Sequence, residues 1–160
     1  MADFIPNVAL GRVVELYNRV KTGDPSGSAL VVVALEASTI ETDAVLRDMD
    51  SLADILAGAT NEATNSGYAR KVLTAADLAT YAPDDTNDRA DLDIPDQVWT
   101  SVLAGDSWAK LVICYRPDSG SPDSAVIPLS VHDFPIIPDG TDVVAQIATG
   151  GFYRATNSAA

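Results

Sequence analysis

The second half of the chain is a series of short segments in which apolar and polar residues alternate, and this pattern constrains the fold more than any other feature. A period of two residues is typical of strands that place one face in a core and the other in solvent. Clusters of glycine, proline and aspartate separate the segments, as at residues 138–140 and 150–151, and such clusters form turns. We therefore expect a sheet built from strands at residues 70–73, 91–94, 108–115, 125–129, 142–148 and 152–154.

The first half of the chain combines one strand signal with one helix signal. Residues 29–35 are a continuous, valine-rich apolar run, which is typical of a strand buried on both faces, and we expect this segment to be the central strand. Residues 10–21 place apolar side chains at helical spacing, and Gly23 and Pro25 follow as a stop signal, so a helix is expected there. The same segment also fits a period of two, which leaves a strand as the alternative.

Residues 38–56 carry a second helix pattern. Ser38 and Glu41 match a capping box, in which the two side chains satisfy unpaired amide groups at a helix start. The sequence therefore predicts one helix that begins at Ser38 and ends near Gly58. Its apolar face would consist of Val45, Leu46, Met49, Leu52, Ile55 and Leu56.

These elements predict a β-dominated α+β fold, with an antiparallel β-sheet or sandwich covered by one or two helices. A chain of 160 residues fits one domain, and roughly 68–70% of its extended surface can be buried at that length. We expect a single domain over residues 1–155, with a short N-terminal arm at 1–8 and a flexible tail at 156–160. Pro128 is expected at a sheet edge or a bulge, because proline donates no hydrogen bond to a ladder.

The charge balance limits the possible partners. The formal net charge is -13, from 10 basic and 23 acidic residues, so nucleic acid and anionic membrane surfaces should be repelled. The N-terminus shows no export signal, and a soluble protein is expected. The one cysteine, Cys114, lies in an apolar run and is expected to behave as a small buried hydrophobe.

An acidic run between Asp84 and Asp96 raises the question of a calcium site. Counted as an EF-hand loop from Asp85, the run has Ala90 where glycine is required and Asp96 where a bidentate glutamate is required. We therefore expect a solvated loop, and a divalent ion remains an alternative. The carboxylates concerned are those of Asp84, Asp85, Asp88, Asp91, Asp93 and Asp96.

Residue types for a hydrolase are present, but no motif organises them. His132 precedes Asp133 and serines are numerous, yet there is no Gly-x-Ser-x-Gly turn to expose a nucleophile. We expect His132 to be a hydrogen-bonded structural residue, and a small hydrolase that uses His132 is the alternative. The sequence predicts no catalytic residue, no cofactor and no metal ligand. Trp99 and Trp108 should pack in the sheet, or else anchor a subunit contact.

The order of several sequence blocks resembles a virion structural protein of tailed bacteriophages, especially those that infect actinobacteria. The resemblance implies a non-enzymatic head decoration protein that binds the exterior of the assembled capsid, with the major capsid protein as partner and self-association into a homo-oligomer, of which a trimer is one form. It also implies synthesis in the bacterial cytoplasm and residence in the virion. A neck, tail or minor capsid role is the alternative. The blocks, which span nearly the whole chain, are residues 11–17, 65–71, 96–100, 127–129, 132–134, 138–142 and 151–154.

Overall fold

A four-stranded antiparallel sheet forms the centre of the molecule. The computed structural model describes residues 3–157, and its main sheet has the strand order β2-β1-β5-β6. Strand β1 pairs with β5 along its whole length, and its first seven residues are buried, so the expected central strand at 29–35 is confirmed. The strands are β1 (Ala29–Glu36), β2 (Lys71–Leu73), β5 (Trp108–Arg116) and β6 (Ile127–Ile136).

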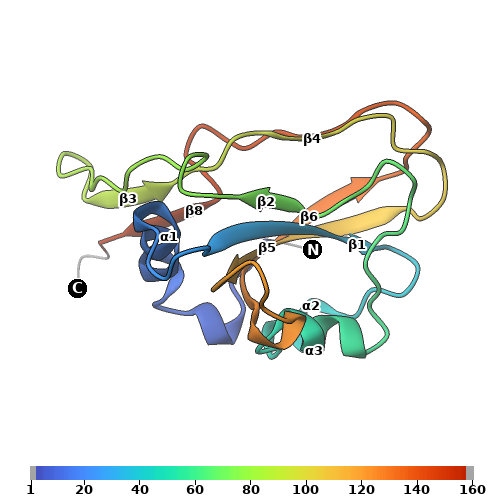
Figure 1. Ribbon diagram of the computed structural model, residues 1–160, viewed down its shortest axis with the longest axis horizontal. Coiled ribbons are helices and arrows are strands. Elements are labelled where there is room, and N and C mark those ends of the chain that lie inside the picture. Colours follow the sequence, from blue (N-terminus) through green and yellow to red (C-terminus); the bar gives the residue numbers. More distant parts are fainter. Residues whose placement is uncertain (1–2, 158–160) are drawn as a thin grey trace.

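Two antiparallel ribbons lie on one side of this sheet, and two short helices lie on the other side (Figure 1). The architecture confirms the predicted β-dominated α+β class with antiparallel sheets and covering helices. One ribbon pairs β3 (Arg89–Leu92) with β8 (Tyr153–Thr156), and the other pairs β4 (Gln97–Trp99) with β7 (Val143–Ala145). The helices are α1 (Val13–Thr22), α2 (Asp43–Arg47) and α3 (Leu52–Ala57), with 3₁₀ turns η1 (Asn7–Ala9) and η2 (Asp123–Ala125).

The sheet separates two apolar cores, because successive side chains of its strands point to opposite faces. Helix α1 and the ribbons cover one face, and α2 and α3 cover the other. The larger core includes Leu16, Tyr17, Val32, Leu92, Trp99, Trp108, Ile113 and Phe152, and the smaller one includes Phe4, Val33, Leu46, Leu52, Ile55, Val112 and Val131.

Helix α1 forms where the spacing of apolar residues predicted it. Gly23 follows the helix in the left-handed conformation, with φ of 69°, and its amide donates to the carbonyl of Val20 at 3.1 Å. The next amide, that of Asp24, donates to the carbonyl of Arg19 at 3.0 Å. Both bonds satisfy carbonyls of the last helical turn, so the expected stop signal acts as predicted.

The single helix predicted from Ser38 to Gly58 is wrong, because the structure has two short helices in this segment. Thr42 and Ser51 are the N-caps of α2 and α3, and the Ser51 hydroxyl accepts a hydrogen bond from the amide of Asp54 at 3.1 Å. The amide of Leu52 donates to the carbonyl of Val126 at 2.8 Å instead of continuing the preceding helix. A second cap and a tertiary hydrogen bond therefore outcompete the helical continuation.

Strand β6 is an edge strand of the main sheet, and the proline within it is placed as predicted. Pro128 pairs with Cys114, next to an irregularity in the register between Ile113 and Cys114. The N-terminal arm covers part of the open edge: Phe4 and Val131 exchange two backbone hydrogen bonds, of 3.0 and 2.9 Å. The arm is therefore docked from residue 3 onward.

At the other end of the chain, backbone pairing continues past residue 155. Strand β8 includes Thr156, which pairs with Arg89. The amide of Asn157 donates to the carbonyl of Asp88 at 3.0 Å. The first two residues of the segment expected as a flexible tail are thus hydrogen-bonded to, or paired with, the β3 region, and residues 158–160 lie outside the described part of the chain.

Candidate functional site

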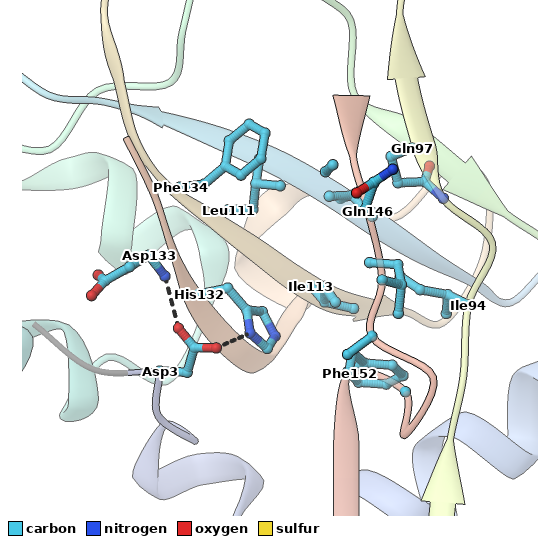
Figure 2. A pocket seen from close by; sticks show the side chains of 15 residues that line it. Asp3, Ile94, Gln97, Leu111, Ile113, His132, Asp133, Phe134, Gln146 and Phe152 are labelled. Carbon is cyan, nitrogen blue, oxygen red and sulfur yellow. Dashed lines mark hydrogen bonds and ion pairs between the residues drawn. The ribbon is translucent and has the colours of Figure 1, made fainter. Parts of the chain in front are cut away.

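A pocket of about 240 Å³ opens between the main sheet and the segment at residues 145–152. Figure 2 shows apolar side chains from the sheet and from the opposite segment around it, with His132 and Asp3 to one side. No sequence motif marks this pocket, because its lining comes from segments far apart along the chain. The apolar lining consists mainly of Val32, Ile94, Leu111, Ile113, Phe134 and Phe152.

His132 is held on both ring nitrogens. Its Nδ1 lies 3.0 Å from Oδ2 of Asp3, and its Nε2 lies 2.9 Å from the hydroxyl of Ser130. Asp133 is not the partner of His132, because neighbouring residues of a strand point to opposite faces, as Figure 2 shows. The carboxylate beside His132 is that of Asp3, which is 129 residues away in sequence and which the sequence analysis missed.

The Asp3 carboxylate joins the N-terminal arm to β6. Its Oδ1 accepts a hydrogen bond of 2.9 Å from the amide of Asp133, while Oδ2 contacts His132. Burial alone would raise the pKa of Asp3, but the hydrogen bonds from His132 and from the Asp133 amide outweigh burial, and the pKa lies below its ordinary value of 3.8. The folded state therefore favours the ionised carboxylate.

Asp3, His132 and Ser130 have the residue types and the order of a hydrolytic triad. A nucleophile must contact the substrate, however, and the Ser130 side chain belongs to a residue with 0% exposure that does not line the pocket. His132 also uses both ring nitrogens for contacts within the protein. In the described arrangement, the three groups fasten the arm to the edge of the sheet and present no nucleophile.

We expect His132→Ala to loosen the N-terminal arm at a cost of about 1 kcal/mol, because one hydrogen-bonded partner of Asp3 is lost. Amide hydrogen exchange should accelerate at Phe4 and at Val131, which pair across the arm. Asp3→Ala should produce the same pattern. The attachment of the arm should also depend on pH in the wild-type protein. The Asp3 carboxylate has its ordinary pKa of 3.8 when the arm is released and a lower pKa when the arm is docked. The attachment should therefore weaken as the pH falls below 3.8 toward the lower value, because the released arm binds the proton more readily. Unchanged exchange in both variants would contradict this role.

On the opposite face of the sheet, a lysine is buried between two carboxylates. Lys110 has 0% exposure; its Nζ lies 3.0 Å from Oδ1 of Asp43 and is also paired with Asp133. Burial alone would lower the pKa of Lys110, but the hydrogen bonds with Asp133 and Asp43 outweigh it and raise the pKa above 10.5. The ammonium group therefore links β5 to both α2 and β6.

The acidic run does not assemble into a metal centre within residues 3–157, where no group of three or more histidine, cysteine, aspartate or glutamate side chains is placed to hold an ion. Asp84 accepts hydrogen bonds from Thr86 and Asn87 within its own turn. Asp91 pairs with Arg154, and Asp96 accepts the amide of Ile147 at 2.8 Å. Asp84 and Asp91 also approach the same guanidinium, that of Arg89, at 3.5 and 3.1 Å. These carboxylates are therefore engaged with groups of the protein itself.

The tryptophans pack inside the fold, as expected for structural residues, and each is 1% exposed. The indole of Trp108 donates to Oδ1 of Asn65 at 2.9 Å, and that of Trp99 donates to the carbonyl of Ala69 at 2.8 Å. The two rings meet edge to face at a centroid distance of 5.3 Å, and the Tyr68 ring is also 5.3 Å from that of Trp108. The sequence block at 65–71 therefore supplies one ring of the aromatic cluster and the hydrogen-bond acceptors of both tryptophans.

The arginine of the same block joins two distant carboxylates. Arg70 forms paired hydrogen bonds with Glu62 and with Asp123, at distances between 2.6 and 3.0 Å. Hydrogen bonds from Arg70 lower the pKa of Asp123, despite partial burial. Cys114 lies nearby on β5, is fully buried, and has a thiol pKa raised by burial, so it has no exposed thiolate.

Comparison of the chain with protein-family models, curated proteins and solved structures finds no match. No helix within residues 3–157 combines the length and the hydropathy needed to cross a membrane.

Proposed function

We propose that the chain is a structural protein of a tailed-phage virion, and specifically a head decoration protein that binds the exterior of the assembled capsid and stabilises it. The resemblance of its sequence blocks carries this proposal. In the structure these blocks fall in or beside fold-building elements, including α1, β4, β6 and β8. Block 65–71 likewise contributes Tyr68 to the aromatic cluster and makes the Arg70 contacts. Sequence blocks that build the fold are consistent with a protein that acts by binding a partner.

The physical properties suit such a role. A net charge of -13 keeps the free protein dispersed before it meets its site. A protein that binds the assembled shell but not the free capsid subunits stabilises the shell by mass action, and many weak sites add to a large effect. The proposed partner is the major capsid protein, and the protein itself forms a homo-oligomer, with a trimer as one form.

Purified protein added to heads that lack it should raise the melting temperature of the heads and should add stoichiometric density to their outer surface. Calorimetry of the heads and electron cryo-microscopy measure the two effects. Heads that already carry the protein are the matched control, and their melting temperature should not change. Density confined to the neck or tail would reject decoration and favour the alternative virion role.

The hydrogen-bonded line from Asp3 through His132 to Ser130 favours a second candidate function, a small hydrolase. This function needs Ser130, which is buried, to become accessible while Asp3 and His132 keep their contact. We expect no hydrolysis of simple aryl esters by the wild-type protein. Ester hydrolysis that His132→Ala abolishes would establish the second candidate instead.

A further inference from the structure

The ribbon of β4 and β7 turns an unusual pair of valines toward solvent. Along both strands exposure alternates: Trp99 and Val143 are buried, while the cross-strand partners Val98 and Val144 are 42% and 44% exposed. The main sheet lies against the other side of the ribbon (Figure 1), and the exposure of both valines shows that the described residues leave the outward side open. We call the outward surface the Val98–Val144 face. It consists of Asp96, Val98, Thr100, Asp142 and Val144, all of which are exposed.

Two carboxylates flank the valine pair in fixed positions. Asp96 precedes β4, and its Oδ1 accepts the amide of Ile147 at 2.8 Å. Asp142 precedes β7, and its Oδ1 accepts the amide of Ser101 at 2.8 Å. The acidic groups are therefore held by the backbone on either side of an apolar centre. An apolar centre with a polar rim is the usual anatomy of a protein-binding surface.

No basic residue balances these carboxylates from the ribbon or its connections. The sequence contains no lysine or arginine between Arg89 and Lys110 or between Arg116 and Arg154, and these two intervals include both strands of the ribbon. Lys71 approaches the ribbon at the ring of Trp99, which is buried on the inner side. The Val98–Val144 face is therefore acidic and apolar, without a cation of its own.

We propose that the Val98–Val144 face docks on a basic protein surface, with the two valines against an apolar patch and the aspartates beside lysine or arginine side chains. A basic partner is favoured because its positive charges complement the two aspartates of the face. A second copy would bring the same aspartates together, and nucleic acid or an anionic membrane would be repelled. The identity of the partner as the outer surface of the capsid rests on the proposed function.

The test compares variants of the full-length protein on heads that lack it. Val98→Lys combined with Val144→Lys should weaken binding by at least about tenfold, because it places two cations against a basic surface. Val72→Lys is the matched control: Val72 is a strand valine with 44% exposure, and it pairs with Val31, whose side chain faces the helix-covered core. This control should bind like the wild type. Raising the salt concentration from about 50 mM to about 500 mM should also weaken wild-type binding.

The outcomes separate this inference from the proposed function. Equal binding by the wild type, the control and the double variant would overturn the Val98–Val144 face and leave decoration intact. Failure of the wild type to bind would overturn decoration and the inference together. A lower mass of the isolated double variant in sedimentation would assign the face to self-association and also overturn the inference. Val98→Ser combined with Val144→Ser should also weaken binding, but to a smaller degree. If its thermal stability equals that of the wild type, the weaker binding is not caused by misfolding.

Discussion

Replacing both Asp43 and Asp133 by asparagine should destabilise the protein by about 3–5 kcal/mol, the usual cost of leaving a buried charge without its partners. The charge is that of Lys110, which has 0% exposure and is ion-paired with both carboxylates. Asparagine keeps the size of aspartate, so the loss reports on charge and not on packing. Urea denaturation followed by circular dichroism measures the difference.

Two further variants identify the source of this loss. Lys110→Met, added to the double variant, removes the uncompensated charge and should recover a large part of the stability. Glu15→Gln is the control for an exposed pair, because Glu15 and Arg19 are about half exposed, and it should cost under about 1 kcal/mol. If the double variant loses no more stability than Glu15→Gln does, the burial of Lys110 does not depend on its two carboxylates.

The same group makes stability depend on alkaline pH. The pKa of Lys110 is raised in the folded state above its ordinary value of 10.5, so the folded protein holds this proton more tightly than the unfolded chain. The contribution is complete below 10.5 and is lost as the pH rises from there through the folded pKa. The free energy of unfolding should therefore fall over this interval in the wild type, and the fall should be smaller in Lys110→Met.

Local patterns predicted the elements whose burial follows a simple period. The run at 29–35 has apolar side chains on both faces, and the structure buries it at the centre of the sheet. Helix α1 has a continuous apolar stripe and a left-handed glycine at its end. In each case the short-range signal and the tertiary environment favour the same conformation. The place of Pro128 was also predictable, because proline lacks the amide N–H that a central strand of a sheet requires.

Long-range pairing was the part that the sequence could not predict. The helix over 38–56 divides at Ser51 because Leu52 bonds to Val126, a residue far along the chain. His132 is paired with Asp3 and not with its neighbour Asp133 for the same reason. The periodicity of β4 and β7 predicts strands, but it does not show that they leave the main sheet as a separate ribbon. The pocket and the Val98–Val144 face both depend on that separation.

Gly151→Ala should destabilise the protein by about 2–5 kcal/mol, because this position combines a left-handed backbone with a close approach to another strand. Gly151 has φ of 75°, and an added Cβ would lie 2.0 Å from the carbonyl oxygen of Leu92. The neighbouring amide of Phe152 donates to that same carbonyl at 2.9 Å, so the segment cannot move away without losing a hydrogen bond. Phe152 also lines the pocket and packs in the larger core.

Gly23→Ala separates the two causes of this loss. Gly23 has a similar φ of 69°, but an added Cβ there would meet no atom within 4 Å. Its substitution should therefore cost only the left-handed conformation, about 1–2 kcal/mol. Urea denaturation of both variants gives the difference, which measures the clash with Leu92 alone. Equal losses would mean that β3 and the segment before β8 separate readily, and the walls of the pocket would then be as mobile as a surface loop.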